Sequence, residues 1–472
     1  MHHLLNLANH TLFIYYLSGN LVYLLALIIA LKTSAAHQRE IESFRLRWIA
    51  ESPLAPPITV LAPALNEEKS IRLSIRNLLE LDYPELEVIV INDGSKDRTL
   101  LELQDEFGLR PIRMVYVQEV PSAGIRGLYR SDADPRLLVI DKESGGSKAD
   151  AVNAGLNAAT SPYVCIVDSD SMLERDALLR IMVPVLADPT RVVGVGGIIR
   201  VLNGSEIRGG QVKRVRLPRK SIEIIQVVEY LRAFLIGREA WAQGNMMMII
   251  SGAFGLFRTD LVRAVGGYRA KAIGEDFDLV TRLHRHLLEK GQEYCIKFVP
   301  DPVCWTEAPS DLKSLGRQRA RWHKGLLDTL RPNLDMLFRS RYGRVGALAL
   351  PYLWIYELFA PIIELGGFLT IFVAAVMGDL SHDFFLQFLI FGYAFATVIS
   401  IGAVLQEELT YKRYNDWQDV ARLVTYCFLE HFPYRQLHMV WRLQGFWQYM
   451  RGDMTWKPLH RKGLQATTTT AP

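Results

Sequence analysis

Two consecutive stretches decide the fold class: "ITVLAPALNEEKSIRLSIRNLLELD" at residues 58–82 and "LEVIVINDGSKDRTLLELQ" at residues 86–104. Each opens with a short apolar, β-branched run and continues into a segment with the apolar period of an amphipathic helix. Strands that alternate with helices in this way build a mostly parallel sheet with helices on its faces. The pattern continues to about residue 311, so residues 51–311 are predicted to form one Rossmann-like α/β domain.

Polar residues fall where the predicted strands end. Asn66 and Glu67 follow the first strand, Asp93 ends the second, and Asp168 and Asp170 follow the run "YVCIV". Each of these could be an ordinary turn or helix-cap residue. Because ligands of open α/β sheets bind at the carboxyl ends of the strands, the group as a whole predicts a polar site at that edge.

The spacing of Asp168 and Asp170 offers two carboxylates to one hard divalent cation, which keeps coordination positions for phosphate oxygens.

Two glycine-rich stretches do not fit known phosphate-binding patterns. The segment "GGSKAD" at 145–150 has its lysine in the wrong place for a P-loop, and "GVGGII" at 194–199 does not match G-x-G-x-x-G. The NTPase and dehydrogenase classes therefore lack their motifs.

Half of the 472 residues are hydrophobic, which predicts apolar spans beside the α/β domain. Residues 12–31 carry no charge and are followed by a basic flank, so residues 1–50 are predicted to hold one span and a cytosolic segment. Two more spans are predicted within residues 345–405, at about 345–377 and 384–405. The chain is thus predicted to be an integral plasma- or inner-membrane protein whose α/β domain is cytosolic.

Charged residues and Pro433 interrupt the apolar pattern of residues 406–472. Because proline ends or kinks a helix, we predict a broken re-entrant or interfacial hairpin with a cytosolic tail. A single crossing that places the tail outside is the alternative. Glu357 and Glu364 lie seven residues apart on nearly one face of the second predicted span, where they would either line an acceptor passage or pair with arginines.

The charge and cysteine content exclude some classes of protein. The net charge of +4 is small and no long basic run occurs, so no nucleic-acid partner is predicted. The four cysteines are far apart in the sequence, which predicts a reducing compartment without a disulfide framework or structural metal.

Seven motifs together resemble the membrane-integrated, inverting family 2 glycosyltransferases, which include cellulose, chitin, hyaluronan and poly-N-acetylglucosamine synthases. They occur in order within residues 57–328: "PALNEE", "VIVINDGS", "GGSKADAVNAGL", "VDSDS", "SGAFGLFR", "GGYRAKAIGEDFDL" and "QRARW". The resemblance implies a GT-A fold, a nucleotide-diphosphate sugar donor that is most often a UDP-sugar, and Mg²⁺ or Mn²⁺ as cofactor. A lipid bilayer and a polysaccharide or glycolipid acceptor are the implied partners.

The same resemblance implies a role for each residue of the predicted donor and metal sites. Asp93 would bind the nucleoside, Lys148 the nucleotide and its diphosphate, and Asp168 and Asp170 the metal ion. The remaining implied donor contacts come from Asn66, Glu67, Gln318, Arg319 and Arg321.

Asp276 of "GED" would be the general base, because inversion needs a carboxylate that removes a proton from the acceptor hydroxyl. The alternative for Glu275 and Asp276 is an acidic first turn of a helix, which is favourable by itself.

Residues 312–344 are predicted to form interfacial helices that carry "QRARW". Guanidinium groups can stabilise the charge of the leaving diphosphate, and an indole offers an apolar face to a sugar ring. The resemblance places Trp322 beside the acceptor, together with Ser251, Gly252 and Glu275.

Processive synthesis of a β-linked polysaccharide is the predicted function, with an export or accessory subunit as a further partner. A transferase that adds a single sugar to a lipid or terminal sugar is one alternative. An inactive scaffold or export subunit is another. The chain has "GED" where cellulose synthases usually have T-E-D, and "IISGAFG" lacks their cysteine, so cellulose is not the first product expected.

Overall fold

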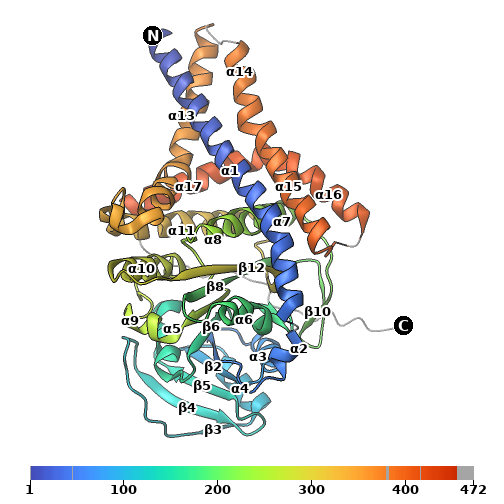
Figure 1. Cartoon of the computed structure of the whole chain (residues 1–472), viewed down its shortest axis with the longest axis vertical. Helices are drawn as coiled ribbons and strands as arrows, with labels where there is room; N and C mark the ends of the chain where they lie inside the picture. The colour runs from blue at the N-terminus through green and yellow to red at the C-terminus, as the bar shows by residue number, and fades with distance from the viewer. Residues whose placement is uncertain (1, 45, 379–381, 415, 454–472) are drawn as a thin grey trace.

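The computed structural model describes residues 2–44, 46–378, 382–414 and 416–453. Figure 1 shows an α/β domain at one end and long helices that leave it at the other, with a layer of helices lying across the boundary. The polar strand ends and the apolar helices are therefore joined through this intermediate layer.

A ten-stranded sheet with the order β3-β4-β5-β2-β1-β6-β11-β8-β12-β7 forms the core of the domain. Its centre is parallel and consists of β5 (Leu137–Lys142), β2 (Leu86–Asp93), β1 (Ile58–Ala64) and β6 (Tyr163–Val167). All seven residues of β1 are buried, as expected of a strand that is covered on both faces. The predicted α/β class is confirmed.

The flanks of the sheet depart from the parallel pattern. On one side, β4 (Ile125–Ser131) runs antiparallel to β5 and to β3 (Leu109–Pro111). On the other side, β11 (Phe254–Arg258) lies antiparallel between β6 and β8 (Val192–Val201), and β12 (Cys295–Thr306) pairs parallel with β8 and antiparallel with β7 (Met172–Leu173). The sheet is mixed, with its parallel part at the predicted site.

Helices cover both faces of the sheet and fix the loops at its edge. In α3, Ile71, Ile75 and Leu78 are buried on one helical face, which is the pattern that predicted this helix. A Cβ at Gly155 of α5 would lie 2.8 Å from Ile91 Cδ1, so the glycine lets α5 pack closely on β2. The covering helices are α3 (Ile71–Leu79), α4 (Thr99–Phe107), α5 (Lys148–Ala158), α6 (Ala177–Ala187), α9 (Thr259–Ala264) and α10 (Glu275–Glu289).

The layer across the boundary carries the "QRARW" motif. It contains α7 (Ser221–Leu231), the π-helical η1 (Arg232–Arg238), α8 (Glu239–Gln243) and α11 (Leu312–Leu330), which ends in the 3₁₀ turns η2 (Arg331–Met336) and η3 (Ser340–Tyr342). Asp311 caps α11 by accepting a 2.8 Å hydrogen bond from the Ser314 backbone N–H.

Two helices in the described part of the chain are long and apolar enough to cross a membrane, at Leu7–Arg39 and Phe385–Thr410. The first lies within α1 (His2–Phe44), which is longer than the predicted span, and the second combines α14 (His382–Leu389), η6 (Ile390–Ala394) and α15 (Phe395–Thr410). The predicted span at 345–377 is bent by 45° between Val345–Leu358 and α13 (Ala360–Val376), and it counts as a third candidate only if both parts are one span. Pro361, in the first turn of α13, lacks the N–H that would continue the preceding helix.

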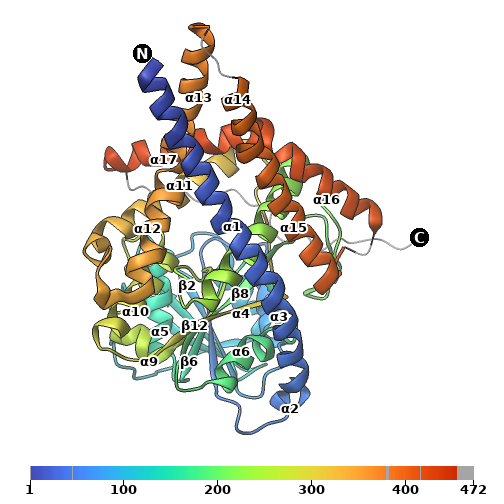
Figure 2. The same cartoon turned by 45° about the horizontal axis from the view of Figure 1, so that its top comes forward.

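The C-terminal segment consists of α16 (Trp417–Leu429), η7 (Glu430–Tyr434) and α17 (Arg435–Met450). Phe432, just before Pro433, has extended backbone angles that interrupt the helix. In Figures 1 and 2, α17 runs crosswise below α13, and α16 lies beside the lower part of α15. Whether this segment forms a re-entrant or interfacial hairpin or crosses the membrane once stays a prediction. The predicted tail at 454–472 lies outside the described residues.

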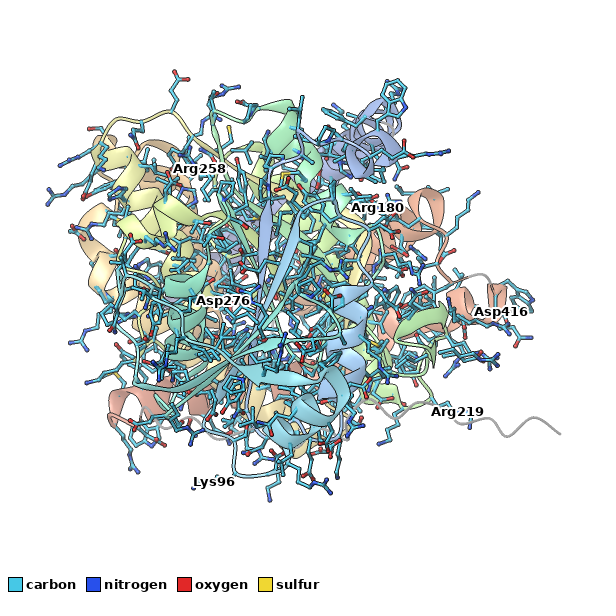
Figure 3. The ribbon with its side chains drawn as sticks, turned by 90° about the horizontal axis from the view of Figure 1, so that it is seen from below. Lys96, Arg180, Arg219, Arg258, Asp276 and Asp416 are labelled. Atoms are coloured by element: carbon cyan, nitrogen blue, oxygen red, sulfur yellow. The ribbon has the colours of Figure 1, made fainter. Side chains whose placement is uncertain are left out.

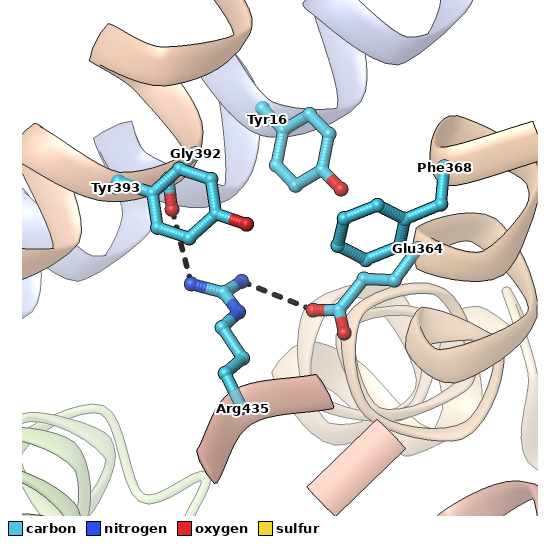
Figure 4. A pocket seen from close by; sticks show the side chains of 6 residues that line it. All are labelled: Tyr16, Glu364, Phe368, Gly392, Tyr393 and Arg435. Carbon is cyan, nitrogen blue, oxygen red and sulfur yellow. Dashed lines mark hydrogen bonds and ion pairs between the residues drawn. The ribbon is translucent and has the colours of Figure 1, made fainter. Parts of the chain in front are cut away.

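Ion pairs join α17 to the two helical parts on either side of the 45° bend, Val345–Leu358 and α13. Arg435 donates 3.0 Å hydrogen bonds to Glu364 and to the carbonyl of Gly392, and Figure 4 shows its guanidinium among Tyr16, Phe368 and Tyr393. Arg442 lies 3.5 Å from the Glu357 carboxylate. Both glutamates thus have arginine partners, which is the second of the two roles considered for them.

Candidate active site

The loops after β1 and β2 are tied to each other at the carboxyl edge of the sheet. Asn66 has a left-handed backbone with φ of 58°, its backbone N–H donates to Ser95 Oγ at 3.0 Å, and its side-chain oxygen accepts from the Lys96 N–H at 2.9 Å. The Glu67 N–H donates to Thr99 Oγ1 at 2.8 Å. Asn66 and Glu67 therefore shape the rim of the site through loop contacts.

Asp93 is buried at the end of β2 and contacts a lysine that the motifs did not indicate. Lys142 Nζ is completely buried and lies 2.7 Å from Asp93 Oδ1 and 2.5 Å from Asp150 Oδ2. Asp93 Oδ1 also accepts a 3.1 Å hydrogen bond from the Gly145 N–H. Lys142 thus joins the ends of β2 and β5 to the first turn of α5.

Lys148, the first residue of α5, joins the β6 end to the loop before β11. Its ammonium forms an ion pair with Asp168 and donates a 2.7 Å hydrogen bond to the Gly252 carbonyl. Burial lowers the pKa of Lys148, but the nearby charges of Asp168 and Glu275 outweigh burial and raise it above its ordinary value. Lys148 is therefore a fixed positive charge beside Asp168.

Asp276 lies in the first turn of α10 and is held through both carboxylate oxygens. Oδ1 accepts from the Phe277 N–H at 2.8 Å, and Oδ2 accepts from the Gly252 N–H at 3.3 Å. In Figure 3, Asp276 lies toward the middle of the molecule, whereas Lys96, Arg219 and Asp416 lie toward its periphery. Gly252 thus links the predicted base to Lys148 and Asp168.

The pKa of the Glu275 carboxyl depends on the charges of the same cluster. Burial raises the pKa of the Glu275 carboxyl and the charge of Asp276 raises it further, while Lys148 and Arg321 act in the opposite direction. Arg321 comes within range because α10 and α11 meet at two glycines: a Cβ at Gly325 would lie 3.0 Å from Gly274 Cα. The structure thus places Arg321 within electrostatic range of Glu275.

The other residues of "QRARW" have different surroundings. Arg319 is only 6% exposed, donates a 2.6 Å hydrogen bond to Glu229 Oε2 of α7, and lies over the Trp322 ring at 4.4 Å from the ring centre. Gln318 is buried as well, whereas Trp322 is 45% exposed. Arg319 was expected on the diphosphate, but its described contacts are with Glu229 and Trp322.

Comparison with known families adds independent evidence. A family model described as glycosyl transferase family 2 matches residues 59–263, and one described as glycosyl transferase family group 2 matches residues 163–401, which is half of the chain. The chain belongs to the family 2 glycosyl transferases. The predicted membership is confirmed, and with the α/β sheet it also confirms the predicted fold class of a GT-A domain joined to apolar helices.

Curated relatives of this family 2 transferase include the poly-beta-1,6-N-acetyl-D-glucosamine synthases of Staphylococcus epidermidis and Staphylococcus aureus. They are 27% and 28% identical to the chain over 305 residues, which is 63% of this chain and 62% of each relative. The match therefore spans less than two thirds of the relatives' length.

Among solved structures, the mannosyltransferase PcManGT from Pyrobaculum calidifontis, in complex with GDP-Man and Mn²⁺, gives a TM-score of 0.49 at 21% identity. That match covers 86% of this chain and 99% of the other. TarS of Staphylococcus aureus gives a TM-score of 0.39 at 15% identity and covers 78% of this chain and 55% of the other. Both likenesses are weak.

The carboxylates of this transferase fit a divalent cation in part. Asp168 and Asp170 follow one strand and offer the hard oxygen ligands that Mg²⁺ and Mn²⁺ accept. Within the described ranges, no group of three or more His, Cys, Asp or Glu side chains could hold a metal ion. A bound cation would therefore need further oxygen ligands from a diphosphate.

The sequence motifs did not indicate two positively charged side chains of the transferase, Lys142 and Arg238. Lys142 could have been suspected, because a charged residue ends the apolar run "LLVIDK". Arg238 of η1 belongs to none of the motifs. Its guanidinium lies 3.8 Å from the centre of the Phe234 ring. Burial lowers the Arg238 pKa to about 10, while the charge of Asp276 acts in the opposite direction. Only the fold brings Arg238 within electrostatic range of the predicted base.

Proposed function

We propose that the chain is a membrane-embedded, inverting glycosyltransferase that moves a sugar from a nucleoside-diphosphate sugar to a growing β-linked polysaccharide. The observation that carries the proposal is the contact path from Asp276 through Gly252 to Lys148 and Asp168. It brings a candidate carboxylate base and a candidate diphosphate-binding cation to one short backbone segment. The anomeric carbon of a donor would be bound beside this segment.

Asp276 acts as the general base in this proposal. As the acceptor hydroxyl oxygen bonds to the anomeric carbon, its proton passes to the Asp276 carboxylate. The bond from the anomeric carbon to the diphosphate oxygen breaks at the same time, and the electron pair leaves with the nucleoside diphosphate. The hydrogen bonds from Phe277 and Gly252 orient the carboxylate for this step.

The donor side is proposed to use Asp93 for the nucleoside, Lys148 and Arg321 for the diphosphate, and Asp168 and Asp170 for Mg²⁺ or Mn²⁺. The ion, when bound, would offset the charge of the leaving diphosphate. Gln318 completes the donor side from α11, and Asn66 and Glu67 support it through the loops that they hold together. Arg319 is given no direct donor contact in this proposal, because its described hydrogen bond is with Glu229.

The acceptor side is proposed to consist of Ser251, Gly252, Glu275 and Trp322. The half-exposed indole of Trp322 supplies an apolar face against which a sugar ring can pack. Because the curated relatives are N-acetylglucosamine polymer synthases, UDP-N-acetylglucosamine is the first donor to test. The apolar helices would hold the enzyme in the plasma or inner membrane with the α/β domain in the cytosol, and an export or accessory subunit would assist release.

A panel of nucleotide sugars tests the proposal. The purified full chain is incubated with each donor and Mg²⁺ or Mn²⁺, and both nucleoside diphosphate release and product size are measured. A ladder of long chains from one donor supports the proposal. A single added sugar identifies a single-transfer enzyme instead, and no release with any donor indicates an inactive scaffold.

A further inference from the structure

Glu229 of α7 joins three segments that are far apart in the sequence. Its Oε2 atom accepts a 2.6 Å hydrogen bond from Arg319 of α11 and a 2.8 Å hydrogen bond from the Tyr434 hydroxyl of η7. Arg319 and Tyr434 are buried, and Glu229 is nearly so. One carboxylate oxygen therefore connects α7 and "QRARW" with the C-terminal segment.

The contact reaches Trp322 through the guanidinium of Arg319. That planar group is held by Glu229 at one nitrogen and lies over the indole of Trp322. Stacking of this kind fixes the plane of an aromatic ring, and it depends on the orientation of the cation. Since Trp322 is otherwise half exposed, Arg319 is the described contact that holds one face of its ring.

The C-terminal segment is packed too closely on α11 to move independently of it. A Cβ at Gly316 of α11 would lie 2.6 Å from Trp441 Nε1, and a Cβ at Gly445 of α17 would lie 2.4 Å from the Ala320 carbonyl oxygen. Tyr434 also meets Trp441 edge to face, with ring centres 6.2 Å apart. The C-terminal segment and the helix that carries Trp322 are therefore in close contact.

We propose that Glu229 is a positioning residue that fixes Trp322 for the acceptor through Arg319, and that Tyr434 makes this position depend on the C-terminal segment. The proposal rests on the function proposed above, in which Trp322 contacts the acceptor. Glu229 itself touches neither donor nor acceptor. Its loss would impair transfer to the acceptor while leaving cleavage of the donor by water intact.

The test compares Glu229→Gln, Tyr434→Phe and Trp322→Ala in the purified full chain supplied with UDP-N-acetylglucosamine and Mg²⁺. The readouts are the ratio of sugar transferred to donor hydrolysed, the donor KM and the length of the product. We expect Glu229→Gln to lower the ratio about tenfold at an unchanged donor KM, because a small misplacement of a reacting group is costly. Tyr434→Phe should give a smaller loss in the same direction.

A matched control separates positioning from general stability. Glu407 of α15 forms a buried pair with Arg200 of β8 at 2.5 Å and has no described contact with Trp322. Glu407→Gln should lower the melting temperature without changing the ratio. If Glu229→Gln lowers donor hydrolysis and transfer in parallel, as a structural defect would, the proposal is overturned.

Combining the substitutions sharpens the result. In the Trp322→Ala background, Glu229→Gln should add little to the loss, because the two residues act through one contact. Fully additive losses would overturn the proposal. If wild type transfers only one sugar, the polymer hypothesis fails by itself, while the transfer-to-hydrolysis ratio still decides the role of Glu229.

Discussion

Two regions of the molecule contain buried or partly buried charges. At the carboxyl edge of the sheet, Lys148 forms an ion pair with Asp168 and a hydrogen bond with a backbone carbonyl. In and around the apolar helices, several glutamates each form an ion pair with one arginine. The second group comprises Glu357 with Arg442, Glu364 with Arg435, Glu407 with Arg200, and Glu430 with Arg232. Lys148 and Asp168 remain about one quarter exposed, while Glu407 and Arg200 are almost completely buried. A diphosphate can compete for the first pair but cannot reach the second.

The comparison teaches that charge inside this protein serves two purposes. Ion pairs among the helices satisfy groups that would be costly to bury alone, and breaking one leaves a buried charge uncompensated. The charges at the sheet edge converge on one backbone segment around Gly252, where the proposed transfer would use them. Substitutions should therefore separate activity from stability according to region.

The largest expected effect is on Asp276. Asp276→Asn should lower the transfer rate by up to about 10⁴-fold, because the amide cannot accept the proton from the acceptor hydroxyl. Donor affinity, measured by titration calorimetry, should stay within about twofold, since the amide keeps the shape of the side chain. Glu289→Gln at the other end of α10 is the control and should leave transfer unchanged. Equal losses of affinity and transfer would assign Asp276 a structural role.

Removal of the metal ion is the next test of the sheet edge. Asp170→Ala, or chelation of Mg²⁺ and Mn²⁺, should lower donor turnover by about 10³-fold because the diphosphate loses the ion that offsets its charge. Turnover is followed by nucleoside diphosphate release. Near-normal turnover in the presence of a chelator would remove the metal from the account.

Lys142 tests whether the sheet edge also contains structural charge. Lys142→Met should lower the free energy of unfolding by about 3 kcal/mol, because Asp93 and Asp150 lose their shared buried cation. Thermal unfolding measures the loss, with the exposed Lys96→Met as control. An unchanged melting temperature would show that the two carboxylates do not depend on Lys142.

The smallest effect is expected at Glu364. Glu364→Gln should cost about 1 kcal/mol of stability, because the amide oxygen can still accept from Arg435 and the Gly392 carbonyl also binds that guanidinium. Donor hydrolysis and product length should both stay within about twofold of wild type. A shorter product at unchanged stability would instead place Glu364 on an acceptor passage and break the division between the two regions.

The sequence predicts the parallel centre of the fold because β1, β2 and β6 are local apolar runs. It also predicts that Asp93 and Asp168 lie at strand ends on one edge of the sheet, where β1 separates their strands, β2 and β6. It does not predict that Arg319 turns toward Glu229, since that contact joins residues 90 positions apart and depends on how α7 packs against α11. The sequence also does not predict which strands at the flanks run antiparallel. The direction of a strand relative to its neighbours depends on which strands pair in the sheet, and the pattern of a single strand does not contain that information.

The most direct test of the central claim is the anomeric configuration of the first bond that the enzyme forms. In the proposed mechanism, the Asp276 carboxylate assists a single in-line attack of the acceptor hydroxyl on an α-linked nucleotide sugar. Nuclear magnetic resonance of the initial product, before any equilibration, should show a β linkage, and Asp276→Asn should form this bond up to about 10⁴-fold more slowly. An α-linked initial product would require two successive displacements and would contradict the role given to Asp276.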